Sequence, residues 1–202
     1  MTDEILSETG WHIVLVGVST AIAVAIGVPL GILAVRRGGL RRLVLGTAGV
    51  IQTIPSLALF GFLLPVPFIG GIGTRTALVA LTLYGLLPVV RNTVVGIDGV
   101  DPAVREAGRG MGMTDRELLF RVELPLASSV ILAGIRTATV IGIGLATIAA
   151  AIGAGGLGVF IFRGLAMVDN RTILAGALPA AALAVVADTA LGALERRLVP
   201  PR

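Results

Sequence analysis

The chain has 202 residues, 55% of them hydrophobic, and a mean hydropathy of +0.99, which exceeds the values of soluble domains and indicates a membrane protein. Its formal net charge of +4 comes from 16 basic residues, all arginines, and 12 acidic ones. Without lysine there is no phosphate-binding P-loop and no Schiff-base chemistry, and without cysteine there is no disulfide or thiolate site. A single histidine excludes a histidine-cluster metal site, so we expect no metal, no cofactor and no catalytic residue.

The first apolar run, residues 12–35, is long enough to cross a bilayer, which takes about 20 apolar residues. The residues before it are acidic and lack the basic region of a secretory signal, so we expect the run to remain as a span. Four arginines follow at once: Arg36, Arg37, Arg41 and Arg42. Because arginines mark the cytoplasmic flanks of spans, the N-terminus is predicted outside, and the basic balance needs no nucleic acid to explain it.

The second apolar run, residues 44–64, is interrupted by Pro55. Polar side chains surround the break: Gln52, Thr53 and Ser56. One interpretation is a kinked helix in which these groups satisfy the backbone that the proline leaves unpaired. We favour a bend that lines a pore, with these three residues and Pro55 as pore-lining candidates.

The third apolar run, residues 76–97, crosses back to the cytoplasmic side. Near its inner end lie Arg91 and Asn92, and snorkelling of these side chains toward the interface is the simplest explanation. We add Asn92 to the pore-lining candidates. The polar interval that follows this run is therefore predicted to be cytoplasmic.

The last runs, 127–152 and 172–194, complete the predicted spans, with a glycine-rich re-entrant or surface helix at 152–165 on the outer side. Arg136 lies too deep for easy snorkelling, so it either faces water or pairs, and Asp188 on the last run is a candidate partner. The sequence thus predicts an all-α polytopic protein with five to six transmembrane helices. It forms a single domain over the whole chain, with a cytoplasmic C-terminus.

The polar interval 98–125 contains six acidic residues and four arginines between apolar runs. Asp101 followed by proline predicts a helix start, and Thr114 with Glu117 forms a capping-box pattern that predicts a second one. We expect two short helices joined by a glycine turn, the second ended by Pro125. Ala103, Ala107 and Met111 share one face of the first helix. The interval is either a solvated loop or, as its double capping and apolar ridge favour, a docking element for a partner.

The interval contains Glu106-Ala107-Gly108, then Gly112, then Val122-Glu-Leu124-Pro125. In its spacing this pattern resembles the EAA loop of ABC importer permeases, with glycine replacing the second alanine and valine replacing isoleucine. In that family the loop is a coupling helix that sits in a groove of the ATPase subunit. The resemblance implies that the following residues couple to the ATPase: Glu106, Ala107, Gly108, Gly112, Met113, Leu124 and Pro125.

The segments 51–65, 81–93 and 152–165 are similar to the branch of the family that carries glycine betaine, carnitine and choline. The resemblance therefore implies the permease subunit of an ATP-driven osmoprotectant importer in a prokaryotic inner (plasma) membrane. Its partners would be a separate ATPase, an extracytoplasmic binding protein and a second permease copy. The alternatives are a permease for another small nutrient, such as an amino acid, and an ATP-independent carrier or channel.

The glycines of residues 153–158 match the GxGxxG pattern of dinucleotide-binding folds. The preceding run has the length of a membrane span, and the position about 20 residues further on, where an acidic residue should bind ribose, falls in an apolar stretch. We therefore interpret these glycines as permitting tight packing and an irregular backbone.

Overall fold

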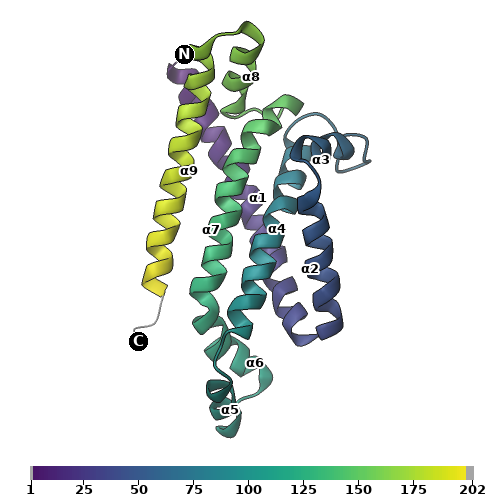
Figure 1. Cartoon of the computed structure of the whole chain (residues 1–202), viewed down its shortest axis with the longest axis vertical. Helices are drawn as coiled ribbons and strands as arrows, with labels where there is room; N and C mark the ends of the chain where they lie inside the picture. The colour runs from purple at the N-terminus through teal and green to yellow at the C-terminus, as the bar shows by residue number, and fades with distance from the viewer. Residues whose placement is uncertain (1, 199–202) are drawn as a thin grey trace.

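The computed structural model describes residues 2–198 of the chain, and this part is all-helical without a strand. Figure 1 shows an elongated bundle of long helices, with α5 and α6 beyond its lower end and α8 at its upper end. The elements, in chain order, are α1 (Thr2–Arg36), α2 (Gly38–Thr53), α3 (Ser56–Leu63), α4 (Thr74–Asp98), α5 (Pro102–Gly110), α6 (Asp115–Leu118), a π-helical segment (Leu119–Glu123), α7 (Leu124–Ala149), a 3-10 turn (Ala150–Ile152), α8 (Gly158–Met167) and α9 (Asn170–Leu198).

Within residues 2–198, four helices are long and apolar enough to cross a membrane: α1, α4, the helix that contains α7, and α9. The pair α2 and α3 passes the same test only when taken together. The prediction of an all-α polytopic protein is confirmed, with four spans, or five if this pair counts as one. The first helix extends beyond the apolar run and starts at Thr2. The negative charges of Asp3 and Glu4 in its first turn interact favourably with the positive end of the helix dipole.

The predicted break of the second apolar run at Pro55 is confirmed, because α2 and α3 are separate helices bent by 101°. Ile54, the residue before Pro55, has φ −70° and ψ 126°, the extended conformation that a following proline ring imposes. The helix therefore stops at Thr53, and α3 leaves in a new direction near the α8 end of the bundle (Figure 1).

Pro125 does not end the second short helix, contrary to the prediction. The chain stays helical from Asp115 through the π-helical segment into α7, and Pro125 lies in the first turn of α7. The N–H of Leu124 makes a π-type bond to the carbonyl of Leu119, five residues back, and α7 begins at Leu124. The first turn of a helix tolerates a residue without an N–H, and the proline is accommodated there.

The centre of the bundle is α4, which packs against both α1 and α7. On α1, a Cβ added to Gly27 would lie 2.8 Å from Val89 Cγ1, and one added to Gly31 would lie 2.6 Å from Thr93 Cβ. These two glycines therefore let α1 and α4 approach closely, as small residues do between membrane helices.

Candidate functional site

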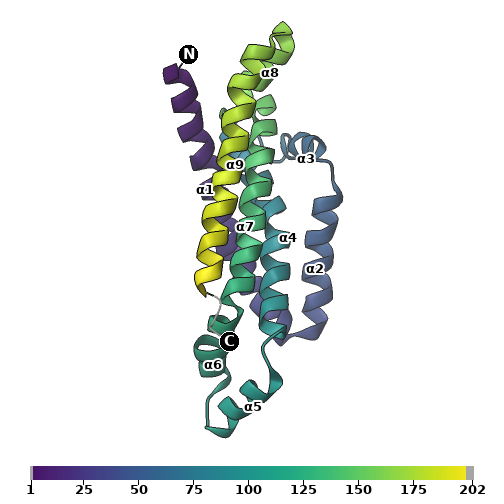
Figure 2. The same ribbon diagram turned by 60° about the vertical axis from the view of Figure 1, so that its left-hand side comes forward.

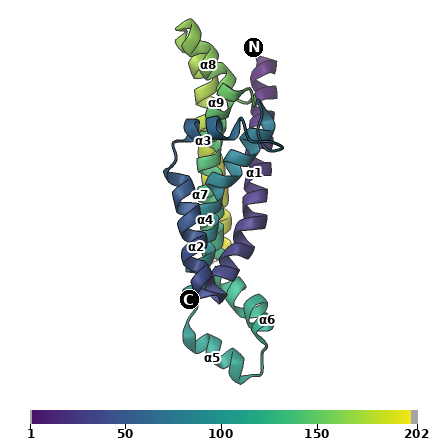
Figure 3. The same ribbon diagram turned by 90° about the vertical axis from the view of Figure 1, so that its right-hand side faces the viewer.

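The most distinctive feature of the fold is the projecting loop, residues 99–123, which carries α5 and α6. Figures 2 and 3 show these two helices as short arms joined by a turn, beyond the ends of α4 and α7. The Asp101 carboxylate accepts a hydrogen bond from the N–H of Ala103 at 2.8 Å and so caps α5. Thr114 and Glu117 form the reciprocal capping box at the start of α6, with bonds of 3.3 and 3.0 Å. Both predicted helix starts are confirmed.

The turn between the two arms depends on Gly112. Its φ of +81° is in the left-handed region, which glycine adopts without the penalty that other residues incur. The N–H of Met113 bonds to the carbonyl of Gly108 at 3.1 Å, and the N–H of Gly112 bonds to that of Arg109 at 2.9 Å. This pair of bonds is the Schellman pattern, which ends α5 and sets the angle at which the chain leaves it.

The inner side of the projecting loop is a small apolar contact between its two arms. Leu118 is fully buried, and a Cβ added to Gly108 would lie 2.8 Å from Leu118 Cδ1 and 3.4 Å from Met113 Sδ. Glycine at position 108 therefore lets the arms close. Of the predicted coupling residues, Gly108 and the half-buried Met113 thus belong to the interior of the loop rather than to its outer surface.

The outer face of α5 is exposed and largely apolar. Ala103 and Ala107 are exposed, as are Val104 (41%) and Met111 (72%). Beside them Glu106 is exposed, and within residues 2–198 it has no hydrogen-bond or ion-pair partner. An apolar patch beside a free carboxylate can dock in an apolar groove that carries a cation at its rim.

The base of the projecting loop contains a residue whose importance the sequence reasoning missed. Glu123 is 1% exposed, and its carboxylate contacts two guanidinium groups: Arg36 at the end of α1, and Arg105 of α5, whose Nε is 3.2 Å away. The one sequence signal that could have indicated this role was the position of Glu123, a single carboxylate at the start of an apolar run. Of the predicted coupling residues that follow it, Leu124 is half-buried and Pro125 exposed.

One of the predicted pore-lining residues at the α2–α3 bend, Gln52, hydrogen-bonds to the backbone of α4. Pro88 inside α4 has no N–H, so the carbonyl of Tyr84 lacks its helical donor, and Gln52 Nε2 donates to it at 3.0 Å. The Tyr84 hydroxyl in turn donates to the carbonyl of Ile54 at the bend. Gln52 thus satisfies backbone freed by a proline of another helix, Pro88, and not the backbone that Pro55 leaves unpaired.

The remaining pore-lining candidates are divided between two places. Thr53 is exposed and bonds back to the Val50 carbonyl at 2.7 Å, while Pro55 (exposed) and Ser56 (half-buried) lie at the bend itself. Asn92 is on α4, where its side chain donates to the carbonyl of Pro88 at 2.8 Å and lies against Gly134 of α7. The candidates thus do not gather into one cluster.

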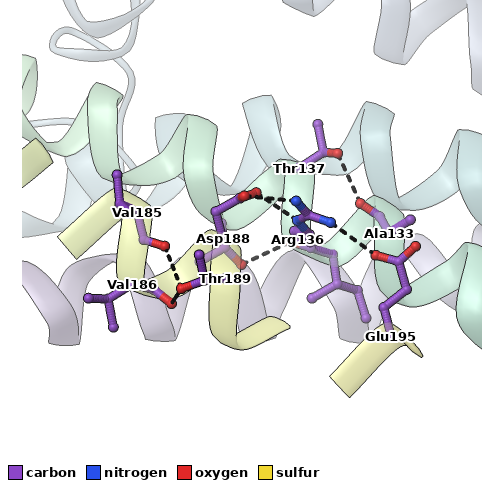
Figure 4. A network of polar contacts seen from close by, with 10 residues as sticks. Ala133, Arg136, Thr137, Val185, Val186, Asp188, Thr189 and Glu195 are labelled. Atoms are coloured by element: carbon purple, nitrogen blue, oxygen red, sulfur yellow. Dashed lines mark hydrogen bonds and ion pairs between the residues drawn. The ribbon is translucent and has the colours of Figure 1, made fainter. Parts of the chain in front are cut away.

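The predicted pairing of Arg136 with Asp188 is confirmed (Figure 4). Arg136 Nε and Nη2 bond to the two Asp188 carboxylate oxygens at 2.6 and 2.7 Å, and Nη1 reaches Glu195 at 3.3 Å. Gly192 on α9 makes room for the guanidinium, because a Cβ there would lie 2.9 Å from Arg136 Nη1. The three charged side chains line a cavity of about 320 Å³ between α7 and α9.

At the α8 end of the bundle, opposite the projecting loop, the glycine segment (residues 153–158) is hydrogen-bonded to α1. The Glu8 carboxylate accepts from the N–H of Gly156 at 2.5 Å, and Trp11 Nε1 donates to the carbonyl of Ala154 at 2.8 Å. His12 is fully buried; its Nδ1 accepts from the N–H of Leu157 at 3.3 Å, so the proton lies on Nε2, 3.1 Å from the Ile143 carbonyl. Backbone N–H groups that could bind a phosphate are thus taken up by α1.

The Asp169 carboxylate, between α8 and α9, caps the last helix. It accepts from the Thr172 hydroxyl at 2.5 Å and from the N–H of Arg171 at 3.0 Å. These bonds favour the charged form and hold the pKa of Asp169 below its usual value, and the bond from Thr172 has the largest effect. In the described part of the chain, no three metal-ligating side chains come together as a metal site.

Known proteins with these features are membrane components of transport systems. The sequence is 46% identical over 196 residues to the carnitine transport permease protein OpuCB of Listeria monocytogenes, covering 97% of this chain and 88% of the relative. It is 49% identical over 196 residues to the osmoprotectant import permease protein OsmW of Salmonella typhimurium, covering 96% and 91%.

The fold is similar to that of a solved structure, an inward-facing conformation of the MetNI methionine ABC transporter. The TM-score is 0.89 at 23% identity, over 99% of this chain and 98% of that one. Residues 27–200 match the family described as binding-protein-dependent transport system inner membrane component. This chain belongs to that family and is a transport subunit of the membrane.

Proposed function

We propose that this chain is the permease subunit of an ATP-driven importer that carries small osmoprotectants such as glycine betaine, carnitine or choline. The observation that carries the proposal is the projecting loop, with its exposed α5 face and the carboxylate of Glu106, which has no partner among the described residues. Since the chain lacks lysine and a P-loop, another chain must hydrolyse ATP. The projecting loop, within the single domain, would be the part of the chain that this ATPase binds.

The names of two relatives support the proposed cargo. One relative, 46% identical, is named for carnitine transport, and the other, 49% identical, for osmoprotectant import. A quaternary ammonium group is held tightly by a cage of aromatic side chains. This chain has one Trp, one Tyr and six Phe. Trp11 and Tyr84, which would be the strongest cage members, are engaged with backbone carbonyls. We therefore assign selection of the cargo to a separate extracytoplasmic binding protein, and passage along weak contacts to this chain.

A second permease copy is the third proposed partner. Four or five spans are too few to enclose a path, so two chains would form it between them. The charged set Arg136, Asp188 and Glu195 supports this arrangement, because each side chain is about a third exposed at 33%, 42% and 28%. Charged side chains at membrane depth face a water-filled cavity or another protein rather than lipid. The α7–α9 face would therefore lie toward the path or the second copy.

The proposed orientation has the projecting loop and the C-terminus in the cytoplasm and the N-terminus outside. Arginines support it: Arg36 at the end of α1 and Arg196 and Arg197 in the last turn of α9 lie toward the loop end of the bundle (Figure 1). Fewer arginines flank spans at the other end. This asymmetry is the one expected of a bacterial inner-membrane protein.

In the proposed mechanism, ATP binding closes the pair of ATPase subunits, and each carries its projecting loop with it. The loop acts as a rigid knob, because its two arms close on Leu118 and both helix starts are capped. Glu106, Ala107 and Gly112 would seat the knob, while Leu124 and Pro125 join it to α7. Movement of the knob then rocks the spans between outward and inward access. The bend at Gln52, Thr53, Pro55 and Ser56, and Asn92, would line the path.

The proposal is tested by purifying the tagged chain from membranes in mild detergent and identifying what accompanies it, then measuring uptake in liposomes. We expect a P-loop ATPase at matching stoichiometry, and ATP-dependent uptake of radiolabelled glycine betaine, carnitine or choline when the binding protein is added. A chain that comes down alone, under conditions that preserve a control ABC complex, would overturn the ATPase assignment. Uptake of a different nutrient only, such as methionine, would overturn the cargo.

A further inference from the structure

The Glu123 carboxylate joins four helices at the point where the projecting loop meets the bundle. It lies at the end of the π-helical segment, directly before α7, and it is 1% exposed. Arg36, the last residue of α1, forms a two-pronged contact with it, and Arg105 approaches from α5. The other end of the Arg105 guanidinium donates to the carbonyl of Ile97 in the last turn of α4. We call Arg36, Glu123 and Arg105 the Glu123 clamp.

The clamp is the principal side-chain attachment of α5 to the bundle. The main packing partners of α5 are α6 and the π-helical segment, which are parts of the same loop. The apolar contact of Gly108, Met113 and Leu118 holds the two arms to each other, not to the spans. A force applied to the outer face of α5 therefore reaches α1 and α4 through Arg105 and Glu123, or else through the backbone alone.

Burial makes this connection stiff. A carboxylate removed from water is held strongly by its ionic partners, because the surroundings screen the attraction less than water does. Two arginines on one carboxylate also fix its position from both sides. The Nε of Arg105 meets Glu123 as an ion pair without the alignment of a hydrogen bond, and it has no other partner within residues 2–198.

We propose that Glu123 and Arg105 are positioning residues for coupling: they make the projecting loop move with α1, α4 and α7 as one body, so that loop displacement becomes span displacement. This inference rests on the proposed function, since it presumes that an ATPase pulls on α5. It goes beyond it by separating two roles. Glu106 and Ala107 hold the partner, whereas Arg105 and Glu123 pass on its motion.

The test compares Arg105→Met with Arg121→Met in liposomes that contain the chain, its ATPase and its binding protein. Arg105→Met keeps the length of the stem and leaves Glu123 paired with Arg36. The Arg121→Met variant loses the same charge two residues from Glu123, but Arg121 is 70% exposed, and its one ion pair within residues 2–198 is with Glu117, at 3.8 Å. The readouts are ATPase bound per chain, ATP hydrolysed, and radiolabelled glycine betaine, carnitine or choline imported per ATP.

We expect Arg105→Met to bind the ATPase as the unaltered chain does and to hydrolyse ATP, but to import about tenfold less cargo per ATP, the effect of losing one charge-assisted bond from the coupling. Arg121→Met should keep the unaltered ratio. A role in stability alone would lower the amount of complex and leave the ratio of import to hydrolysis unchanged, and that result would overturn the inference.

A second variant, Arg105→Lys, covers the case in which Arg105→Met does not reach the membrane. Lysine keeps the charge, but a single ammonium cannot replace the fork that reaches both Glu123 and the Ile97 carbonyl. We expect an intermediate loss of import per ATP, and an unaltered ratio would again overturn the inference. If the unaltered chain couples normally, the proposed function stands whichever result the variants give. An unaltered chain that binds no ATPase would overturn both.

Discussion

The glycine-rich connections at the two ends of the bundle differ in how closely other groups surround them. The projecting loop extends beyond the spans, and a Cβ added at Gly110 or Gly112 would meet nothing within 4 Å. The glycine segment at the α8 end is drawn into the bundle. A Cβ at Gly155 would lie 2.8 Å from Trp11, one at Gly156 would lie 3.0 Å from His12, and one at Gly158 would lie 1.9 Å from the Thr147 carbonyl oxygen.

The difference teaches that the same residue type serves two purposes in one chain. In the glycine segment, residues 153–158, glycine allows other groups to come close, so substitutions there act on the fold. At Gly110 and Gly112 of the projecting loop glycine leaves its surroundings empty, so substitutions there act on whatever docks. Stability and partner binding should therefore respond separately to changes at the two ends.

The largest effect is expected for Gly158→Ala. Its Cβ would overlap the backbone of α7, which cannot move aside as a flexible side chain can, and we expect a loss of about 3 kcal/mol in the free energy of unfolding. The measurement is thermal unfolding of the purified protein in detergent. Gly144→Ala in α7 is the matched control, since nothing lies within 4 Å of its added Cβ. An unfolding temperature equal to that of the unaltered chain would contradict the close packing at this end.

A smaller loss is expected for His12→Ala. The change removes a fully buried ring and leaves the N–H of Leu157 without its acceptor, for a cost of about 2 kcal/mol. Ile13→Ala, at a neighbouring position that is 49% exposed, should cost less. Thermal unfolding of the two variants side by side gives the comparison, and equal losses would mean that α1 does not hold the glycine segment.

At the other end, Gly112→Asp should leave the fold nearly intact and weaken ATPase binding at least about tenfold, or about 1.4 kcal/mol. Asp is among the residues that tolerate positive φ, and its side chain would point into open space. Gly71→Asp is the control, because Gly71 also has a positive φ and open surroundings but lies at the α8 end. The readout is the ATPase that co-purifies with each variant. If Gly112→Asp bound the ATPase as the unaltered chain does, that result would contradict the proposed docking role of the projecting loop.

The smallest effect is expected for Asp169→Ala, which removes the cap of α9 and should cost about 1 kcal/mol. Because its hydrogen bonds lower the pKa of Asp169, its stabilising contribution is present above the ordinary pKa of an aspartate and is lost as the pH falls through the lowered value. Hydrogen exchange at the start of α9 measures both effects. Protection factors of these amides that stay unchanged on acidification to that range would contradict the cap.

Features that depend on neighbouring residues could be predicted from the sequence. The caps at Asp101 and Thr114 follow from local hydrogen bonding, and the stop before Pro55 follows from the proline ring. The pairing of Arg136 with Asp188 was also accessible, because a charge at membrane depth needs a partner and few carboxylates lie in the spans.

Apart from this pair, features that join distant residues could not be predicted. The Glu123 clamp brings together residues 36, 105 and 123, and no local pattern reports that these positions meet. The passage of the helix through Pro125 depends on a five-residue bond between Leu124 and Leu119, which the proline alone gives no reason to expect. The engagement of Gln52 depends on a proline in another helix, Pro88.

The most direct test of the account is a single cysteine placed at Ala107, on the outer face of α5, in a chain that has none of its own. Reaction with a maleimide would be measured in inside-out membrane vesicles, with and without the ATPase, against a cysteine at Phe68, which is 95% exposed at the α8 end. The account predicts that the ATPase protects position 107 and leaves position 68 unchanged. Equal labelling of position 107 with and without bound ATPase would contradict it.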